Sequence, residues 1–107
     1  MTSNNVQESV EKAWEERGSI TSETRGAVRD AVETALNGLD AGRYRVAEPL
    51  ETGWFVHQWL KKAVLLSFRL KDMYVIDGGP GGAHWWDKIE SKFARWDQTQ
   101  FKESGFR

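Results

Sequence analysis

The 107-residue sequence has no cysteine, two prolines and no long hydrophobic run. Without cysteine, no disulfide can form and no thiolate can act as a nucleophile or metal ligand, which fits a reducing compartment. The polar N-terminal segment lacks the apolar core of a secretory signal, and no stretch is apolar over the length needed to span a bilayer. We therefore expect a soluble, cytoplasmic protein without a membrane partner.

The sequence also has almost no net charge. Its 15 basic and 16 acidic residues are interleaved and give a formal charge of −1. This balance provides no general electrostatic reason to bind nucleic acid. The two histidines, His57 and His84, lack metal-ligand spacing, and a metal site needs three or four converging ligands. We expect neither a metal nor a cofactor, with His57 as a half-buried hydrogen-bonding residue and His84 exposed.

Aromatic residues are abundant instead, with six tryptophans and five phenylalanines. They supply the apolar area that a single small domain over residues 1–107 needs for a core. Trp14, Trp54 and Trp59 occupy apolar phases of their elements and are predicted to be buried. The adjacent Trp85 and Trp86 cannot both enter one small core, so at least one is expected to be exposed or in an interface.

The most apolar stretch is Trp54–Leu70, and from Gln58 onward it predicts a helix. Trp59, Ala63, Leu66 and Leu70 share one helical line, and the apolar arc of about 200° requires cover on two sides. The arc also includes Leu60, Val64, Ser67 and Phe68, and the Ser67 hydroxyl is expected to bond to the carbonyl four residues earlier. Leu65 stands alone in the polar sector, which makes it an interface candidate.

Two helices precede this central helix and are expected to pack on it as an antiparallel pair. The first is predicted to be capped by Asn4 and to end at Gly18, and the second to run from Thr21 or Ser22 to Gly42. Gly38 inside the second helix costs about 1 kcal/mol relative to alanine, so an irregular last turn is expected.

A period of two then predicts a β-hairpin, Arg43–Leu50 with Gly53–His57, whose apolar face must rest on the helices. Beyond the central helix we expect either a brief strand or the frayed helix end at residues 73–76. A short helical piece near residues 89–93 follows, and then a last helix capped by Asp97 that ends at Gly105. The fold class is α+β and mostly α.

No constellation of catalytic residues is visible. The glycine-rich loop Asp77–Ala83 matches neither the dinucleotide fingerprint nor the phosphate loop and is interpreted as a flexible connector. Lys61, Lys62 and Ser67 have no neighbouring base of the kind that activates a nucleophile.

One stretch nevertheless resembles a known family. The run Gln58–Arg69, Gln-Trp-Leu-Lys-Lys-Ala-Val-Leu-Leu-Ser-Phe-Arg, is similar to the signature of the N-terminal domain of tetrahydrodipicolinate N-succinyltransferases, acyltransferases of lysine and diaminopimelate synthesis. The resemblance continues through Arg45–Glu48, Val75–Pro80, Trp86–Lys88 and Gly105–Arg107. It implies transfer of succinyl from succinyl-CoA, a co-substrate, by a homotrimer with active sites between neighbouring left-handed β-helices and no prosthetic group.

The resemblance also implies what this chain contributes. The family's β-helix would follow residue 107, and the chain has no hexapeptide period of its own. We expect an N-terminal domain without catalytic residues, inactive alone, whose partners are the β-helix domain and neighbouring subunits. Arg107 is the one residue to which the family gives a role, in binding the dicarboxylate substrate, and a guanidinium suits a carboxylate. In the isolated chain we expect Arg107 to be disordered and unable to bind substrate usefully.

An alternative remains open: a stand-alone paralogous module without catalysis. It would bind a full-length enzyme, or itself, through the surface around Leu65, Trp85 and Trp86. The encoding reading frame separates the two hypotheses, because an in-frame β-helix supports the first and a native stop codon supports the second.

Overall fold

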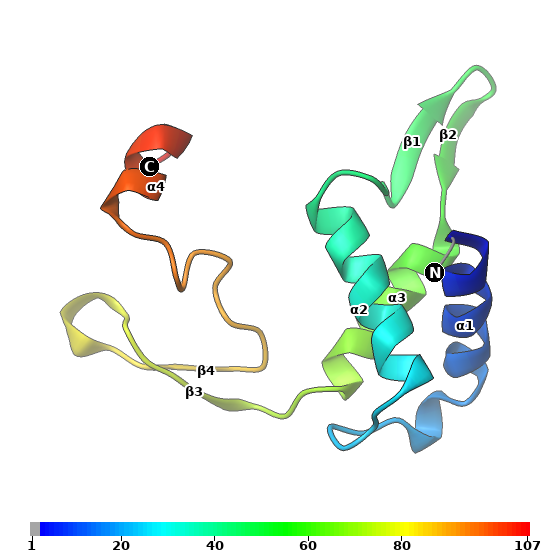
Figure 1. Ribbon diagram of the computed structural model, residues 1–107, viewed down its shortest axis with the longest axis horizontal. Coiled ribbons are helices and arrows are strands. Elements are labelled where there is room, and N and C mark those ends of the chain that lie inside the picture. Colours follow the sequence, from blue (N-terminus) through cyan, green and yellow to red (C-terminus); the bar gives the residue numbers. More distant parts are fainter. Residues whose placement is uncertain (1–2) are drawn as a thin grey trace. The chain divides into compact units, whose positions relative to one another are not determined.

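The computed structural model describes residues 3–107, which form four α-helices and two antiparallel hairpins (Figure 1). This confirms the predicted α+β, mostly helical class. Where the sequence predicts a single domain, contacts divide the chain into two compact units, Met1–Asp72 and Met73–Arg107. We call them the helical unit and the aromatic unit.

The core of the helical unit lies among α1 (Ser3–Glu15), α2 (Ala27–Asp40) and α3 (Gln58–Arg69), each of which packs against the other two. The predicted central helix is therefore confirmed, with cover from two sides. Twelve apolar side chains are buried there: Val6, Val10, Ala13, Ile20, Ala31, Val32, Ala35, Trp59, Leu60, Ala63, Leu66 and Leu70.

The buried face of α3 is narrower than the sequence predicts. Phe68 is 39% exposed and Val64 is half-buried, although both lie in the predicted apolar arc. The Ser67 hydroxyl donates to the Val64 carbonyl oxygen at 2.6 Å, three residues earlier rather than four. On the polar side, Lys62 Nζ lies 2.7 Å from the Glu11 carboxylate, so an ion pair joins α3 to α1.

The predicted starts of the first two helices are wrong. Asn4 lies inside α1 instead of capping it, and α2 begins at Ala27, five residues after the predicted start at Ser22. Thr21 forms a local turn with Thr24, in which the Thr21 N–H donates to Thr24 Oγ1 at 2.9 Å and the Thr24 N–H donates to the Thr21 carbonyl at 3.1 Å. Such side-chain bonds satisfy the backbone outside a helix, and they delay the helix here.

The last turn of α2 is regular, contrary to expectation, and Gly38 is what allows the chain to fold back over it. The Gly38 carbonyl accepts N–H bonds from Arg43 at 2.9 Å and Tyr44 at 3.1 Å. A Cβ at position 38 would lie 2.3 Å from Cδ2 of Tyr44. The Tyr44 ring in turn meets Trp59 edge to face, with centroids 5.5 Å apart. Glycine is therefore required by close packing rather than by a turn.

The first hairpin, β1 (Ala47–Leu50) with β2 (Gly53–Val56), is shorter than predicted and projects from the helices (Figure 1). Its register pairs Pro49 with Trp54 and Glu48 with Phe55. Trp54 and Phe55 are neighbours on β2, so their rings lie on opposite faces of the hairpin. Packing of one face on the helices could therefore not bury both rings.

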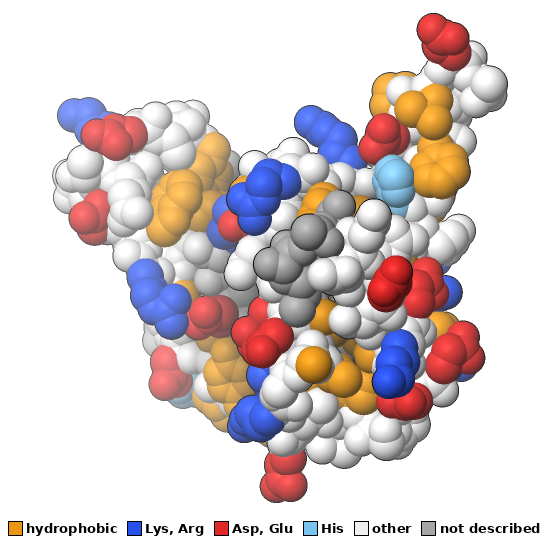
Figure 2. Space-filling view, turned by 45° about the vertical axis from the view of Figure 1, so that its right-hand side comes forward, with side chains coloured by type: hydrophobic (Ala, Val, Ile, Leu, Met, Phe, Trp, Pro, Cys, Tyr) orange, Lys and Arg blue, Asp and Glu red, His pale blue; other side chains and the backbone are white. Residues whose placement is uncertain are grey.

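The hairpin's large apolar side chains are consequently exposed, and Figure 2 shows hydrophobic side chains gathered along it. The predictions that its apolar face rests on the helices and that Trp54 is buried are both wrong, because Trp54 is 74% exposed. Trp59 is buried in the core, as predicted, whereas Trp14 is only half-buried against it. At the hairpin base the half-buried His57 bonds to the Glu48 carboxylate at 2.9 Å through Nε2, which confirms its predicted role.

Within the described residues, no helix has both the length and the apolar character that a membrane span requires.

Candidate functional site

The aromatic unit begins with a second hairpin, β3 (Tyr74–Ile76) paired with β4 (Trp85–Asp87). Ile76 lies opposite Trp85 and Val75 opposite Trp86, so the two tryptophans point to opposite faces. Trp85 is 58% and Trp86 65% exposed, which confirms that the pair does not enter a core. Residues 73–76 thus take the strand alternative rather than a frayed helix end.

The glycine-rich loop between these strands is folded back on itself, with a 3₁₀ turn at Pro80–Gly82. Asp77 Oδ1 and His84 Nδ1 lie 2.7 Å apart, and the Gly79 N–H donates to the Ala83 carbonyl at 3.1 Å. A Cβ on Gly79 would lie 2.6 Å from that oxygen and 2.7 Å from Nε1 of Trp85. These contacts give the loop a defined turn, its predicted flexibility stays a prediction, and His84 is exposed as predicted.

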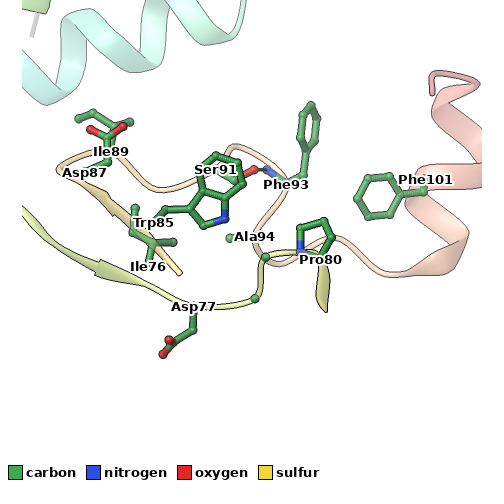
Figure 3. Close-up of a pocket in the computed structure, with 12 residues that line it drawn as sticks. Ile76, Asp77, Pro80, Trp85, Asp87, Ile89, Ser91, Phe93, Ala94 and Phe101 are labelled. Atoms are coloured by element: carbon green, nitrogen blue, oxygen red, sulfur yellow. Dashed lines mark hydrogen bonds between the residues drawn. The ribbon is translucent and has the colours of Figure 1, made fainter. Parts of the chain in front are cut away.

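An open pocket of about 580 Å³ lies on the Trp85 face of this hairpin (Figure 3). Its walls are mainly apolar and are formed by Ile76, Pro80, Trp85, Ile89, Phe93, Ala94 and Phe101, with Asp77, Asp87, Ser91 and two glycines completing the lining. In Figure 3 the Trp85 indole lies across the middle of the pocket, whereas the Asp77 carboxylate points away from it. We call this hollow the aromatic pocket.

The segment after β4 forms turns instead of the predicted helical piece near residues 89–93. The Phe93 N–H donates to the Ser91 hydroxyl at 3.1 Å, a local bond that competes with a helix. The helix α4 (Gln98–Ser104) follows, with the predicted capping box: Asp97 Oδ1 accepts from the Gln100 N–H, and Gln100 Oε1 accepts from the Asp97 N–H, both at 2.9 Å. Gly105, at φ 74°, ends the helix as predicted.

Four rings gather around this last helix: Phe93, Trp96, Phe101 and Phe106. The Phe106 ring lies 4.8 Å from that of Phe93 and 5.8 Å from that of Phe101, centroid to centroid. The residue that precedes Arg107 therefore contacts the other rings through its side chain. Sequence reasoning missed this cluster, because its members follow no helix or strand period that would signal a common face.

Arg107 itself is exposed, beside the anchored Phe106. Its predicted disorder and its role in binding substrate stay predictions. A guanidinium at such a position can form two charge-assisted bonds to a carboxylate. Leu65, the other candidate from the sequence, lies in the helical unit and is 40% exposed.

Two of the three candidate nucleophiles have structural contacts, and the third, Lys61, is exposed. Lys62 is paired with Glu11, and the Ser67 hydroxyl is bonded to a backbone carbonyl. Among residues 3–107, no three potential metal-ligating side chains converge. The described residues thus offer an exposed guanidinium at Arg107 and an apolar pocket, and they show no nucleophile with an adjacent base.

Comparison with known proteins identifies the family. A family model described as the N-terminal part of tetrahydrodipicolinate N-succinyltransferase matches residues 5–70, more than half of the chain. A 2,3,4,5-tetrahydropyridine-2,6-dicarboxylate N-succinyltransferase from Rhodospirillum rubrum is 62% identical over all 107 residues, which span 38% of that relative. A protein of the same name from Methylorubrum populi is 58% identical over 103 residues, which are 96% of this chain and 37% of that relative. Another from Rhizobium rhizogenes is 59% identical over 103 residues, which are 95% of this chain and 36% of that relative.

The chain thus spans less than two-fifths of the length of these relatives. Its match to the family model includes α2, the first hairpin and the whole of α3. The signature run that forms α3 lies within the match, as the resemblance in the sequence predicts. The chain belongs to the N-terminal domain family of the tetrahydrodipicolinate N-succinyltransferases.

Proposed function

We propose that this chain is the N-terminal domain of an enzyme that succinylates ring-opened tetrahydrodipicolinate in lysine and diaminopimelate synthesis. The amino group of the substrate attacks the thioester carbonyl of succinyl-CoA, the new amide forms, and CoA leaves as its thiol. The observation that carries the proposal is 62% identity, over the entire chain, to a relative bearing this enzyme name. The groups that bind CoA and move protons would lie outside residues 1–107.

Within this chain, Arg107 is proposed to bind a carboxylate of the substrate. Phe106 packs on two other rings, and Gly105 ends α4 in a left-handed turn, so position 107 directly follows a residue that contacts the ring cluster. A bidentate guanidinium contact fixes the orientation of a planar carboxylate as well as binding it. Arg107 is a substrate-binding residue in this proposal, and the chain itself provides no catalytic group.

The assembly proposed for the intact enzyme is a homotrimer in the cytoplasm that needs no metal or prosthetic group. Its subunits would meet through the β-helix domain expected beyond this chain. Light scattering on the intact protein checks the trimer, since a monomer or dimer of the active enzyme would contradict it.

Activity is expected only when the rest of the enzyme is present. We would compare the 107-residue chain with a fused protein in which this chain replaces the matching segment of the Rhodospirillum rubrum relative. Release of CoA thiol from succinyl-CoA, dependent on the tetrahydrodipicolinate substrate, is expected from the fused protein alone. Substrate-dependent release of CoA by the 107-residue chain would contradict the proposal that the catalytic groups lie outside it. An inactive but folded fused protein would contradict the proposed function.

In the fused protein, Arg107→Lys is expected to raise KM for the dicarboxylate about tenfold. Lysine keeps the charge but loses the two-point contact, and a loss of about 1.4 kcal/mol in binding corresponds to that factor. Steady-state kinetics with the dicarboxylate as the varied substrate give the measurement. Arg95→Lys is the matched control, because the exposed Arg95 is paired only at 3.6 Å with Glu90 and has no proposed substrate contact. Equal KM values for the two variants would rule out the role given to Arg107.

A further inference from the structure

The aromatic unit has no buried side chain. Throughout residues 73–107 every residue is exposed or half-buried. Chains below about 40 residues rarely fold alone without disulfides, metals or a partner. This unit has no cysteine, and within the described residues no group of three potential metal ligands occurs. Its stability must therefore come from a surface that covers it.

The aromatic pocket, of about 580 Å³, lies wholly within this unit and has mainly apolar walls. Three of its walls stay open to solvent, since Trp85 is 58%, Ile89 41% and Phe101 40% exposed. Exposed apolar surface of this kind marks an interaction site. A small polar ligand fits it poorly, because such sites carry converging polar groups. Here Asp77 points away from the pocket and is paired with His84 (Figure 3). The other two polar lining side chains accept local backbone bonds, Asp87 from the Lys88 N–H at 2.7 Å and Ser91 from the Phe93 N–H at 3.1 Å.

The position of the chain's last residues indicates what covers the pocket. Phe93 and Phe101 both line the pocket, and both pack on Phe106, at 4.8 and 5.8 Å between centroids. Residue 107 thus directly follows a residue whose ring packs on two side chains of the pocket wall. The chain matches a model of the family's N-terminal part and spans 38% of its Rhodospirillum rubrum relative, so most of that relative's length lies outside the matched segment.

A segment tethered at residue 107 would meet the pocket at a high effective concentration, of the order of millimolar for a short linker. A second copy of the chain has no such advantage at ordinary protein concentrations. Apolar side chains from a tethered segment would also bury Trp85 and Phe101 without adding a charge.

We propose that apolar side chains from the part of the enzyme that follows residue 107 fill the aromatic pocket, and that the aromatic unit acquires a buried core only then. The inference rests on the proposed function, because it requires that the relatives' remaining domain follows this chain. The pocket is then a domain interface on which folding of residues 73–107 depends, not a ligand site.

Amide hydrogen exchange tests this in two proteins, the 107-residue chain and the fused protein described above. In the chain alone, amides of residues 73–107 are expected to exchange within about tenfold of the unfolded-chain rate. In the fused protein they are expected to slow by at least about 100-fold, while the amides of α1–α3 stay equally protected in both. Protection of residues 73–107 in the chain alone would overturn the proposal. If that protection rises with protein concentration, the occupant is a second copy.

Two neighbouring substitutions locate the interface within the fused protein. Ile76 faces the pocket and Val75 lies on the opposite face of β3. Ile76→Ser is expected to speed amide exchange in residues 73–107 by at least about tenfold. Val75→Ser is expected to speed it by less than about threefold. An equal or larger effect of Val75→Ser would overturn the assignment of the face.

The succinyl-transfer assay keeps the two proposals apart. Activity of the fused protein without slowed exchange would overturn the interface and leave the proposed function standing. Slowed exchange without activity would support the interface and overturn the proposed function.

Discussion

Replacing Leu66 with alanine is expected to lower the free energy of unfolding of the helical unit by about 3 kcal/mol. Leu66 lies in the middle of α3, is fully buried and belongs to the core that α3 shares with α1 and α2. Truncation of a buried leucine loses the transfer free energy of its methyl groups and leaves a cavity, at a cost of about 2–5 kcal/mol. Urea unfolding followed by far-ultraviolet circular dichroism, with linear extrapolation, gives the measurement.

Leu65→Ala is the matched control for this prediction. Leu65 is the preceding residue of the same helix and has the same side chain, but it is 40% exposed. A loss below about 1 kcal/mol is expected, since little area leaves water at this position on folding. Equal losses for the two variants would contradict the orientation of α3 on which the fold depends.

The second large effect is expected at Gly38, with a sign opposite to that of helix propensity. Alanine in a helix interior is favoured over glycine by about 1 kcal/mol. In this structure, however, the added Cβ would lie 2.3 Å from Cδ2 of Tyr44, a ring that is itself packed on Trp59. Overpacking costs about 1–3 kcal/mol, and such a short contact is expected to cost the upper value. The gain of about 1 kcal/mol from helix propensity offsets part of this cost. Gly38→Ala is therefore expected to destabilise the helical unit by about 2 kcal/mol.

Thermal or urea unfolding of this variant should be compared with Gly18→Ala. No atom lies within 4 Å of the position that a Cβ on Gly18 would occupy, so this control is expected to stay within about 0.5 kcal/mol of the wild-type stability. A Gly38→Ala protein more stable than the wild type would show that helix propensity outweighs the Tyr44 contact.

The parts of the fold that the sequence predicts correctly depend on local signals. Residues 58–69 form α3 because their apolar side chains recur at helical spacing, and the last helix starts at Asp97 because its capping box involves residues only three apart. The exposure of Trp85 and Trp86 is predicted because two adjacent rings cannot both enter one small core, and in the structure they lie on opposite faces of a strand.

The errors lie where two segments compete or meet. α2 starts late because Thr21 and Thr24 form a local turn that satisfies backbone groups outside a helix, and Trp54 is exposed because the first hairpin projects from the helices (Figure 1). For the candidate site, the resemblance singled out Arg107, but neither the ring cluster around Phe106 nor the aromatic pocket has a sequence signal. Contacts between residues several positions apart in irregular turns leave no period.

By itself, the sequence determined the central helix, the capped last helix and the family to which the chain belongs, because periodicity, caps and signature residues are local properties of the chain. Only the tertiary structure decided that Gly38 is needed for the approach of Tyr44, that the first hairpin projects with its aromatic rings exposed, and that residues 73–107 surround an open pocket without a buried core. These features depend on distances between segments, and such distances are established only when the whole chain has packed.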